Sequence, residues 1–257
     1  MDFLEEVSRR VEGRCAGGGS RSGRGFVEAL WEGWKERRLA IIGEFKRCAP
    51  GRFVGLHEPW VYAEQLAPYV DAFSVLTEPY WFCGSYELIP IFSAHKPVLA
   101  KDFTGCERMI EEAREWGASA VLLILDQLGW SRLTRLYDTA RSLGLDALIE
   151  TSSARDAIEA YRSMPEAAIG INARNLHTLE VSQKRLLEEV EKASREEPGM
   201  MLVAESSVKS VEEALRVKMA GAKAVLIGTW FMREPDAAEK LYATLVEQRK
   251  GGDSFSG

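Results

Sequence analysis

The sequence predicts an α/β fold, a (β/α)8 TIM barrel with additional N-terminal helices. From residue 39 onward, short apolar runs alternate with amphipathic segments at intervals of about 22–30 residues, the pattern of parallel strands joined by crossover helices. Eight such units fit a closed barrel better than an open doubly wound sheet. The chain has 257 residues, 46% of them hydrophobic, which is enough to bury such a core.

The predicted barrel spans residues 39–248. Its strands are expected at 39–45, 71–76, 97–101, 119–124, 146–150, 167–171, 200–205 and 223–228. Its helices are expected near 58–69, 85–93, 105–116, 130–143, 153–163, 182–195, 208–220 and 235–248. Gly117, Gly144 and Gly221 each stand between a predicted helix and the next strand, where a glycine commonly ends a helix.

Residues 1–38 are predicted to form an N-terminal helical extension. Residues 2–12 read as a short amphipathic helix, and the Gly-, Ser- and Arg-rich stretch 13–25 reads as a mobile loop. Closure of this loop over a substrate is a hypothesis that the sequence leaves open. A second helix is expected at 26–38, with an apolar stripe that favours core packing over ligand binding: Phe26, Leu30, Trp31 and Trp34. Residues 249–257 are predicted to be a disordered tail.

Composition excludes several classes of function. The net charge is −6 and the basic residues are interleaved with glutamates, whereas a nucleic-acid-binding protein is expected to carry a basic stripe. The apolar runs are far shorter than the ~20 residues that a membrane helix needs. The acidic first residues do not resemble a signal peptide. We therefore expect a cytoplasmic protein with no nucleic-acid or membrane partner. A monomer is also expected, although the sequence does not give the oligomeric state.

Cysteine and histidine spacing predicts no metal site and no cofactor. None of the four cysteines forms a CxxC pair, and none of the three histidines lies near another candidate ligand in sequence. Cys48 and Cys83 both fall in predicted loops at the same end of the barrel. A disulfide between them is one possibility and two free thiols are the other, since disulfides are unusual in cytoplasmic proteins outside hyperthermophiles.

Five of the predicted strands end on a polar or charged residue. These residues are Glu44, Lys101, Glu150, Asn172 and Glu205. An ionised group at the edge of a core costs several kcal/mol unless it is paired or solvated, so one such residue could be an accident of packing. Five at the carboxyl ends of successive strands indicate an active site, because TIM-barrel enzymes place their sites at that rim. The alternative is a buried ion-pair network without chemistry, which has no reason to prefer that end.

Strand geometry sharpens this prediction. Glu44 and Lys46 are two residues apart and therefore point to the same side, while Phe45 points toward the helices. Lys101, Glu150 and Glu205 end the third, fifth and seventh strands, and alternate strands of a barrel contribute to the same layer. Together with Glu44, they are expected to form one ring in which acids and bases shift each other's pKa.

The loops after the seventh and eighth strands are the usual phosphate site of this fold. The seventh strand is followed by Ser206 and Ser207, and the eighth by Gly228 and Thr229. Their hydroxyl and backbone N–H groups are suitable donors for a phosphate. Neither segment is a strong motif by itself, so the prediction depends on their place in the repeat.

From about residue 39 to 248, the chain resembles the indole-3-glycerol phosphate synthase family. The most specific segments are Lys101-Asp102-Phe103 and Gly170-Ile171-Asn172-Ala173-Arg174. The other matching segments are 42–47, 74–78, 82–86, 97–100, 148–150, 175–176 and 203–206. Residues 1–38 match weakly, although the family is a TIM barrel with extra N-terminal helices.

The resemblance implies roles for individual residues. The family closes the indole ring of 1-(2-carboxyphenylamino)-1-deoxyribulose 5-phosphate with loss of CO₂ and water. By analogy, Lys101 polarises the carbonyl, Glu150 shuttles protons, and Lys46, held by Glu44, neutralises substrate charge or supplies a second acid. The sequence does not decide which of the two lysines acts in which acid step. The implied substrate-binding residues are Asn172, Arg174, Glu205, Ser206 and, as an apolar wall, Phe82, Phe103, Leu122 and Leu176. The implied phosphate-binding residues are Lys46, Ser207, Gly228 and Thr229.

Three positions depart from the family pattern. Ala49 stands where a serine is usual, Ser207 where a glycine is usual, and Thr229 where a serine is usual. If the usual glycine adopts a positive φ, Ser207 is strained. Two other functions stay open. One is a different phosphosugar barrel enzyme, such as an isomerase or an aldolase with Lys101 as Schiff-base nucleophile. The other, which draws on Ala49 and Ser207, is a phosphate-ligand sensor or subunit without activity.

Overall fold

The computed structural model describes residues 25–49, 53–172 and 182–253. The predicted helix at 2–12, nearly all of the predicted loop at 13–25, and the last four residues of the predicted tail lie outside these ranges. Two predicted substrate-binding residues, Arg174 and Leu176, also lie outside them. No helix in the described part of the chain is long and apolar enough to cross a membrane.

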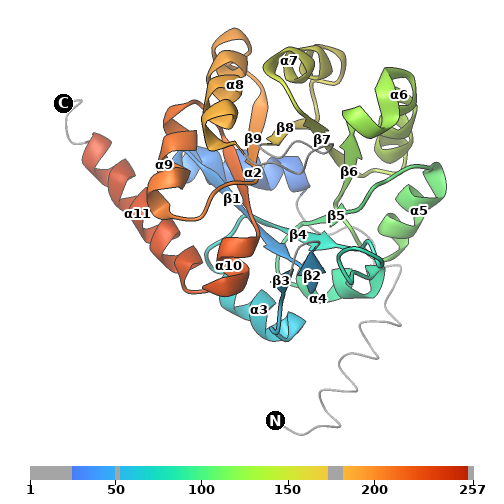
Figure 1. Cartoon of the computed structure of the whole chain (residues 1–257), viewed down its shortest axis with the longest axis horizontal. Coiled ribbons are helices and arrows are strands. Elements are labelled where there is room, and N and C mark those ends of the chain that lie inside the picture. The colour runs from blue at the N-terminus through green and yellow to red at the C-terminus, as the bar shows by residue number, and fades with distance from the viewer. Residues whose placement is uncertain (1–24, 50–52, 173–181, 254–257) are drawn as a thin grey trace, which may run out of the picture.

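Eight parallel strands close into a barrel, which confirms the predicted fold (Figure 1). Around the barrel the order is β1-β10-β9-β8-β7-β6-β5-β4, with each strand paired to its neighbours in parallel. The strands are β1 (Ala40–Phe45), β4 (Ala72–Leu76), β5 (Val98–Lys101), β6 (Ala120–Ile124), β7 (Asp146–Thr151), β8 (Ala168–Asn172), β9 (Met201–Glu205) and β10 (Ala224–Ile227). Each lies within one residue of its predicted bounds.

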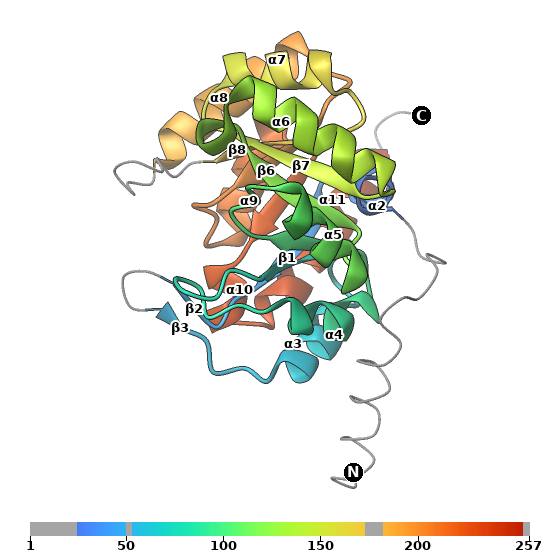
Figure 2. The same cartoon turned by 90° about the vertical axis from the view of Figure 1, so that its right-hand side faces the viewer.

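Helices surround this sheet on its outer side (Figures 1 and 2). They are α3 (Pro59–Leu66), α4 (Ile89–Ser93) after the short 3₁₀ helix Tyr86–Leu88, α5 (Glu107–Glu115), α6 (Leu125–Ser142), α7 (Ala154–Ser163), α8 (Gln183–Glu196), α9 (Val211–Met219), α10 (Thr229–Arg233) and α11 (Ala237–Asp253). In α6, Gly129 is non-helical, so the regular helix starts close to the predicted residue 130. The last helix, α11, continues past its predicted end at residue 248.

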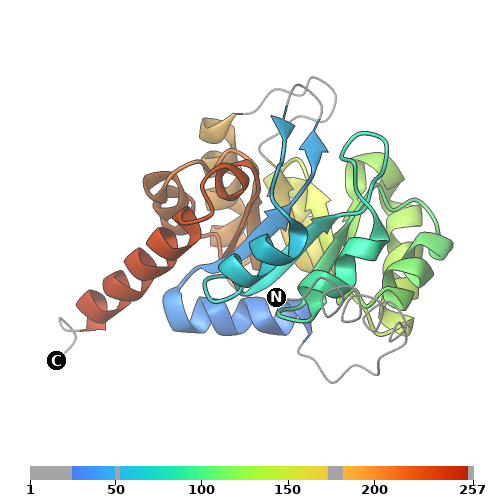
Figure 3. The same ribbon diagram turned by 90° about the horizontal axis from the view of Figure 1, so that it is seen from below.

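Helix α2 (Phe26–Arg37) covers the amino-terminal end of the barrel (Figure 3). Phe26 and Leu30 are fully buried in one cluster with inward-facing strand residues such as Ile42 and Leu148, which confirms the predicted packing role of this stripe. Arg37 is buried beside Asp71, with Nη2 2.5 and 2.6 Å from the two carboxylate oxygens.

The opposite end carries a small hairpin that the sequence did not predict. Its strands are β2 (Cys48–Ala49) and β3 (Phe53–Val54), which pair antiparallel and stand above the carboxyl ends of the barrel strands (Figure 3). The hairpin follows β1 directly. As predicted, Phe45 faces outward, with its ring 5.5 Å from that of Tyr62 and 5.0 Å from that of Phe92.

Candidate active site

Lys101 lies at the centre of the polar rim. Its Nζ is 3.3 Å from Glu150 Oε2 and 3.1 Å from Glu205 Oε2. These side chains come from the ends of β5, β7 and β9, so strand geometry brings the predicted third-, fifth- and seventh-strand residues together. The side chains of Glu150 and Glu205 are almost fully buried. An ammonium between two buried carboxylates is a proton-transfer arrangement.

Asn172 fixes the second oxygen of the Glu150 carboxylate. Its Nδ2 donates a hydrogen bond of 2.9 Å to Glu150 Oε1, from the end of the adjacent strand β8. The two oxygens of Glu150 thus accept from different side chains, Lys101 on one side and Asn172 on the other. The orientation of this carboxylate is set before any ligand binds.

Glu44 and Lys46 form a second ion pair at the end of β1. Lys46 Nζ donates to Glu44 Oε1 over 2.9 Å, as expected from their same-side spacing. Gly228 lies against this pair: a Cβ added there would be 2.3 Å from Glu44 Oε1 and 3.0 Å from Lys46 Nζ. A side chain at position 228 would displace the ends of these two side chains, so a glycine there leaves the pair its present position.

Burial and charge shift the pKa values of the central cluster. Burial alone would lower the pKa of Lys101, but the neighbouring carboxylates of Glu205, Glu150 and Glu44 raise it well above its ordinary value. Burial raises the pKa of Glu205 to about 8, against the attraction of Lys101 and with added repulsion from Glu150. Lys101 is therefore held as a cation, and Glu205 keeps its proton to a higher pH than an exposed glutamate does.

Gly170 makes room for the Glu205 carboxyl group. A Cβ added at Gly170, on the neighbouring strand β8, would lie 2.0 Å from Glu205 Oε1. In the described part of the chain, Oε1 is buried and has no hydrogen-bond partner. Oε1 is the oxygen that does not face Lys101 in the pair described above.

The titration of Glu205 predicts a measurable pH dependence. Above pH 8, Glu205 loses its proton, and a second full carboxylate then holds the Lys101 proton and repels an anionic substrate. We expect kcat/KM of the wild type to fall above about pH 8. In Glu205→Gln this alkaline limb should be absent, with kcat/KM at pH 7 within about tenfold of the wild type. An unchanged alkaline limb in the variant, measured over pH 6–10, would contradict the assignment.

The raised pKa of Glu205 also makes the free energy of unfolding depend on pH. In the unfolded chain the carboxyl group releases its proton with an ordinary pKa of 4.5, so the native state binds more protons than the unfolded state between about pH 4.5 and 8. Raising the pH through that window therefore lowers the free energy of unfolding that Glu205 contributes. Glu205→Gln should remove this contribution to the pH dependence of unfolding.

The predicted phosphate residues lie beyond the ends of β9 and β10. Ser206 and Ser207 have φ values of 65° and 64°, in the left-handed region, and Ser207 Oγ is buried without a partner among the described residues. The expected strain at Ser207 is therefore present, at a cost of roughly 1–2 kcal/mol for a residue that is not glycine. Thr229 opens α10, the short helix that follows Gly228.

The predicted apolar wall is only partly at the rim. The rings of Phe82 and Phe103 are 6.4 Å apart, and Phe103 is 41% exposed. Leu122 lies in the interior cluster, below the rim, and the strand register aligns Ile124 rather than Leu122 with Glu150. Of the predicted wall residues that the structure describes, Phe82 and Phe103 therefore lie together, apart from Leu122 in the barrel interior.

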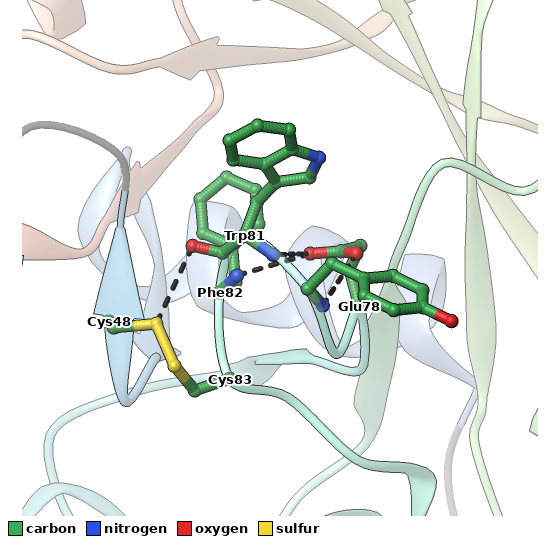
Figure 4. Close-up of a disulfide and its surroundings, with 6 residues drawn as sticks. Cys48, Glu78, Trp81, Phe82 and Cys83 are labelled. Carbon is green, nitrogen blue, oxygen red and sulfur yellow. Dashed lines mark hydrogen bonds between the residues drawn. A yellow bond between two sulfur atoms is a disulfide. The ribbon is translucent and has the colours of Figure 1, made fainter.

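Two features near the rim were not predicted as part of the site. The carboxylate of Glu78 is buried and accepts hydrogen bonds from the backbone N–H groups of Tyr80, Trp81 and Phe82 (Figure 4). Glu78 follows a predicted strand, as the rim residues do, so the same signal could have identified it. Cys48 and Cys83 form a disulfide, which decides the alternative left open by the sequence.

Comparison with known proteins agrees with the geometry of the rim. Residues 5–243 match the family model described as indole-3-glycerol phosphate synthase. The chain belongs to this family. The synthase of Aeropyrum pernix is 42% identical over 248 residues, covering 95% of this chain and 92% of the relative. That of Pyrobaculum arsenaticum is 40% identical over 247 residues, covering 94% and 96%. The resemblance seen in the sequence is confirmed.

Solved structures add evidence on the fold alone. A flavocytochrome b2 variant with sulfite bound aligns with a TM-score of 0.62 and 13% sequence identity, over 82% of this chain and 64% of that chain. At that identity, the likeness extends to the barrel and not to its chemistry. The synthase family assignment rests on the sequence comparisons. Among the described residues, no group of His, Cys, Asp and Glu side chains could hold a metal ion.

Proposed function

We propose that this chain is an indole-3-glycerol phosphate synthase in tryptophan biosynthesis. It would convert 1-(2-carboxyphenylamino)-1-deoxyribulose 5-phosphate into indole-3-glycerol phosphate, CO₂ and water. The observation that carries the proposal is Lys101 between Glu150 and Glu205 at the carboxyl rim of a barrel that matches this family over residues 5–243. Such an enzyme is a carboxy-lyase acting on a small phosphosugar.

Lys101 is assigned to ring closure. The aryl carbon attacks the ribulose carbonyl, and negative charge develops on the carbonyl oxygen. An ammonium held in a buried site stabilises that charge by hydrogen bonding and electrostatics. The raised pKa of Lys101 keeps it protonated when the substrate arrives. The attacking aryl carbon, which carries the carboxylate, then loses CO₂, and the electron pair of the broken bond restores the aromatic ring.

Glu150 is assigned to the dehydration that completes the indole. Expulsion of a hydroxyl group as water requires one proton on the departing oxygen and removal of another from the ring. Glu150 is oriented by Asn172 and lies within 3.3 Å of Lys101, so it can exchange a proton with either the substrate or the ammonium. The Glu44–Lys46 pair is assigned to neutralising the charge of the substrate carboxylate or phosphate.

Binding of the rest of the substrate follows from its chemistry. The phosphate is assigned to the loops after β9 and β10, through Ser206, Ser207, Gly228 and Thr229, together with Lys46. The aryl ring is assigned to Phe82 and Phe103. Arg174, Leu176 and Leu122 stay predictions from the resemblance, as do a cytoplasmic location and a monomeric state.

The deciding experiment is turnover by the purified protein. We expect formation of indole-3-glycerol phosphate, detected by its indole fluorescence, with one CO₂ released per product. Ligand binding without any product would favour a sensor. A borohydride-trapped substrate adduct on Lys101 would favour an aldolase-type enzyme, because only Schiff-base chemistry leaves a reducible imine.

A further inference from the structure

The Cys48–Cys83 disulfide joins the loops that follow the first two barrel strands. Their Cα atoms are 5.6 Å apart, although the residues are separated by 35 positions in the sequence. Cys48 follows Lys46 by two residues, and Cys83 follows Phe82 directly. The bridge therefore connects the loop of Lys46, which is assigned to neutralising the substrate charge, to the loop of Phe82, which is assigned to binding the aryl ring.

Other contacts support the same junction. The backbone N–H of Cys48 donates to the carbonyl oxygen of Phe82 over 3.2 Å. Cys48 Sγ lies 3.5 Å from the carbonyl oxygen of Trp81, a contact without a donated proton because the sulfur is in a disulfide (Figure 4). On the other side of the loop, the Glu78 carboxylate gathers three consecutive backbone N–H groups at 2.6–3.1 Å. The loop of residues 78–83 is thus stabilised internally by hydrogen bonds to Glu78, and it is joined to the β2–β3 hairpin through Cys48.

Both joined segments need such an anchor. The β2–β3 hairpin pairs only two residues on each strand, and a hairpin this short has little stability of its own. Cys48 and Ala49 are only half-buried, so core packing holds them weakly. Cys83 has a φ of 53°, a left-handed conformation that a residue other than glycine adopts only when its surroundings impose it.

We propose that the Cys48–Cys83 disulfide is a positioning element of the active site, which holds Lys46 and Phe82 at the separation that the substrate requires. Reduction of the bridge then loosens the two loops while the barrel stays folded. This inference rests on the proposed function for the identity of the ligand. The inference concerns only the order of the two loops, which can be measured without measuring turnover.

The position of the bridge predicts which kinetic constant changes. Lys101, Glu150 and Glu205 hold one another at the ends of other strands, through contacts that do not involve the bridged loops. The loops instead carry groups assigned to binding. We therefore expect reduction to raise KM about tenfold while kcat changes less than about threefold, because pre-organised binding groups lower the cost of binding.

The test compares the oxidised wild type, the wild type reduced with a phosphine, and Cys48→Ser/Cys83→Ser. The expected result is the same rise in KM for the last two, reversed by reoxidation only in the wild type. Cys106→Ser is the matched control, because Cys106 is an exposed free thiol that takes no part in the bridge, and its KM should be that of the wild type. Circular dichroism checks that every sample is folded.

A second readout does not depend on turnover. Backbone amide hydrogen exchange should speed up at residues 46–49 and 78–84 in the reduced and doubly substituted proteins, and stay unchanged at 98–101 and 146–151. If hydrogen exchange changes as expected but no sample forms product, the proposed function is wrong, and the inference that the disulfide holds the two loops in place is supported. Equal KM values for oxidised and reduced enzyme, or exchange that rises evenly over the barrel, would overturn the inference.

Discussion

Replacing Lys101 by alanine is expected to lower kcat by about 10³–10⁴-fold while changing substrate affinity little. The ammonium stabilises charge that exists on the carbonyl oxygen only during ring closure, so its loss affects the transition state more than the bound substrate. Steady-state turnover and isothermal titration with the substrate would measure the two effects separately. Retention of near-normal kcat would overturn the role given to Lys101.

Lys223→Met is a suitable control for this variant. Lys223 is also a buried lysine next to a barrel strand, but at the opposite end, where its Nζ contacts the carbonyl oxygens of Pro198 and Met200 and lies 5.0 Å from the ring centre of Trp31. Its replacement should lower the melting temperature and leave kcat unchanged below that temperature. Loss of activity in both variants would indicate a general effect of removing a buried cation.

Replacing Glu150 by glutamine is expected to lower kcat by about 10²–10³-fold. The amide keeps the shape of the side chain and one acceptor for the cation, but it cannot take or release a proton. Because Glu150 is assigned to dehydration, CO₂ release should precede formation of the indole product in a single turnover. Rapid quench with separate detection of CO₂ and indole would resolve the two steps.

The control for that experiment is the wild type under the same conditions, where both signals should rise together if dehydration is not limiting. Equal slowing of CO₂ release and indole formation in Glu150→Gln would place Glu150 at or before ring closure. The assignment to dehydration would then be wrong.

The barrel and its polar rim could be predicted because both depend on local patterns. Strands buried on both faces produce uninterrupted apolar runs, and helices with one apolar face separate them. Each rim residue stands at the end of such a run, and the alternation of strands in a barrel places Lys101, Glu150 and Glu205 together. Their pairing distances then confirmed the predicted proximity.

Features that depend on distant contacts could not be predicted in the same way. The β2–β3 hairpin has two-residue strands and α10 has five residues, so neither is long enough to show a periodicity. Gly170 and Gly228 are required by side chains on neighbouring strands, which the sequence alone does not align. The disulfide joins residues 35 positions apart, and spacing cannot distinguish such a pair from two free thiols.

The central claim is that Lys101 donates to the ribulose carbonyl oxygen. A crystal structure with a stable ligand in which that carbonyl is reduced to an alcohol tests it most directly. We predict Lys101 Nζ within about 3 Å of the alcohol oxygen, with Glu150 and Glu205 still contacting the ammonium. If that oxygen instead faces Lys46, with Lys101 beyond hydrogen-bond distance, the assignment of the two lysines is contradicted.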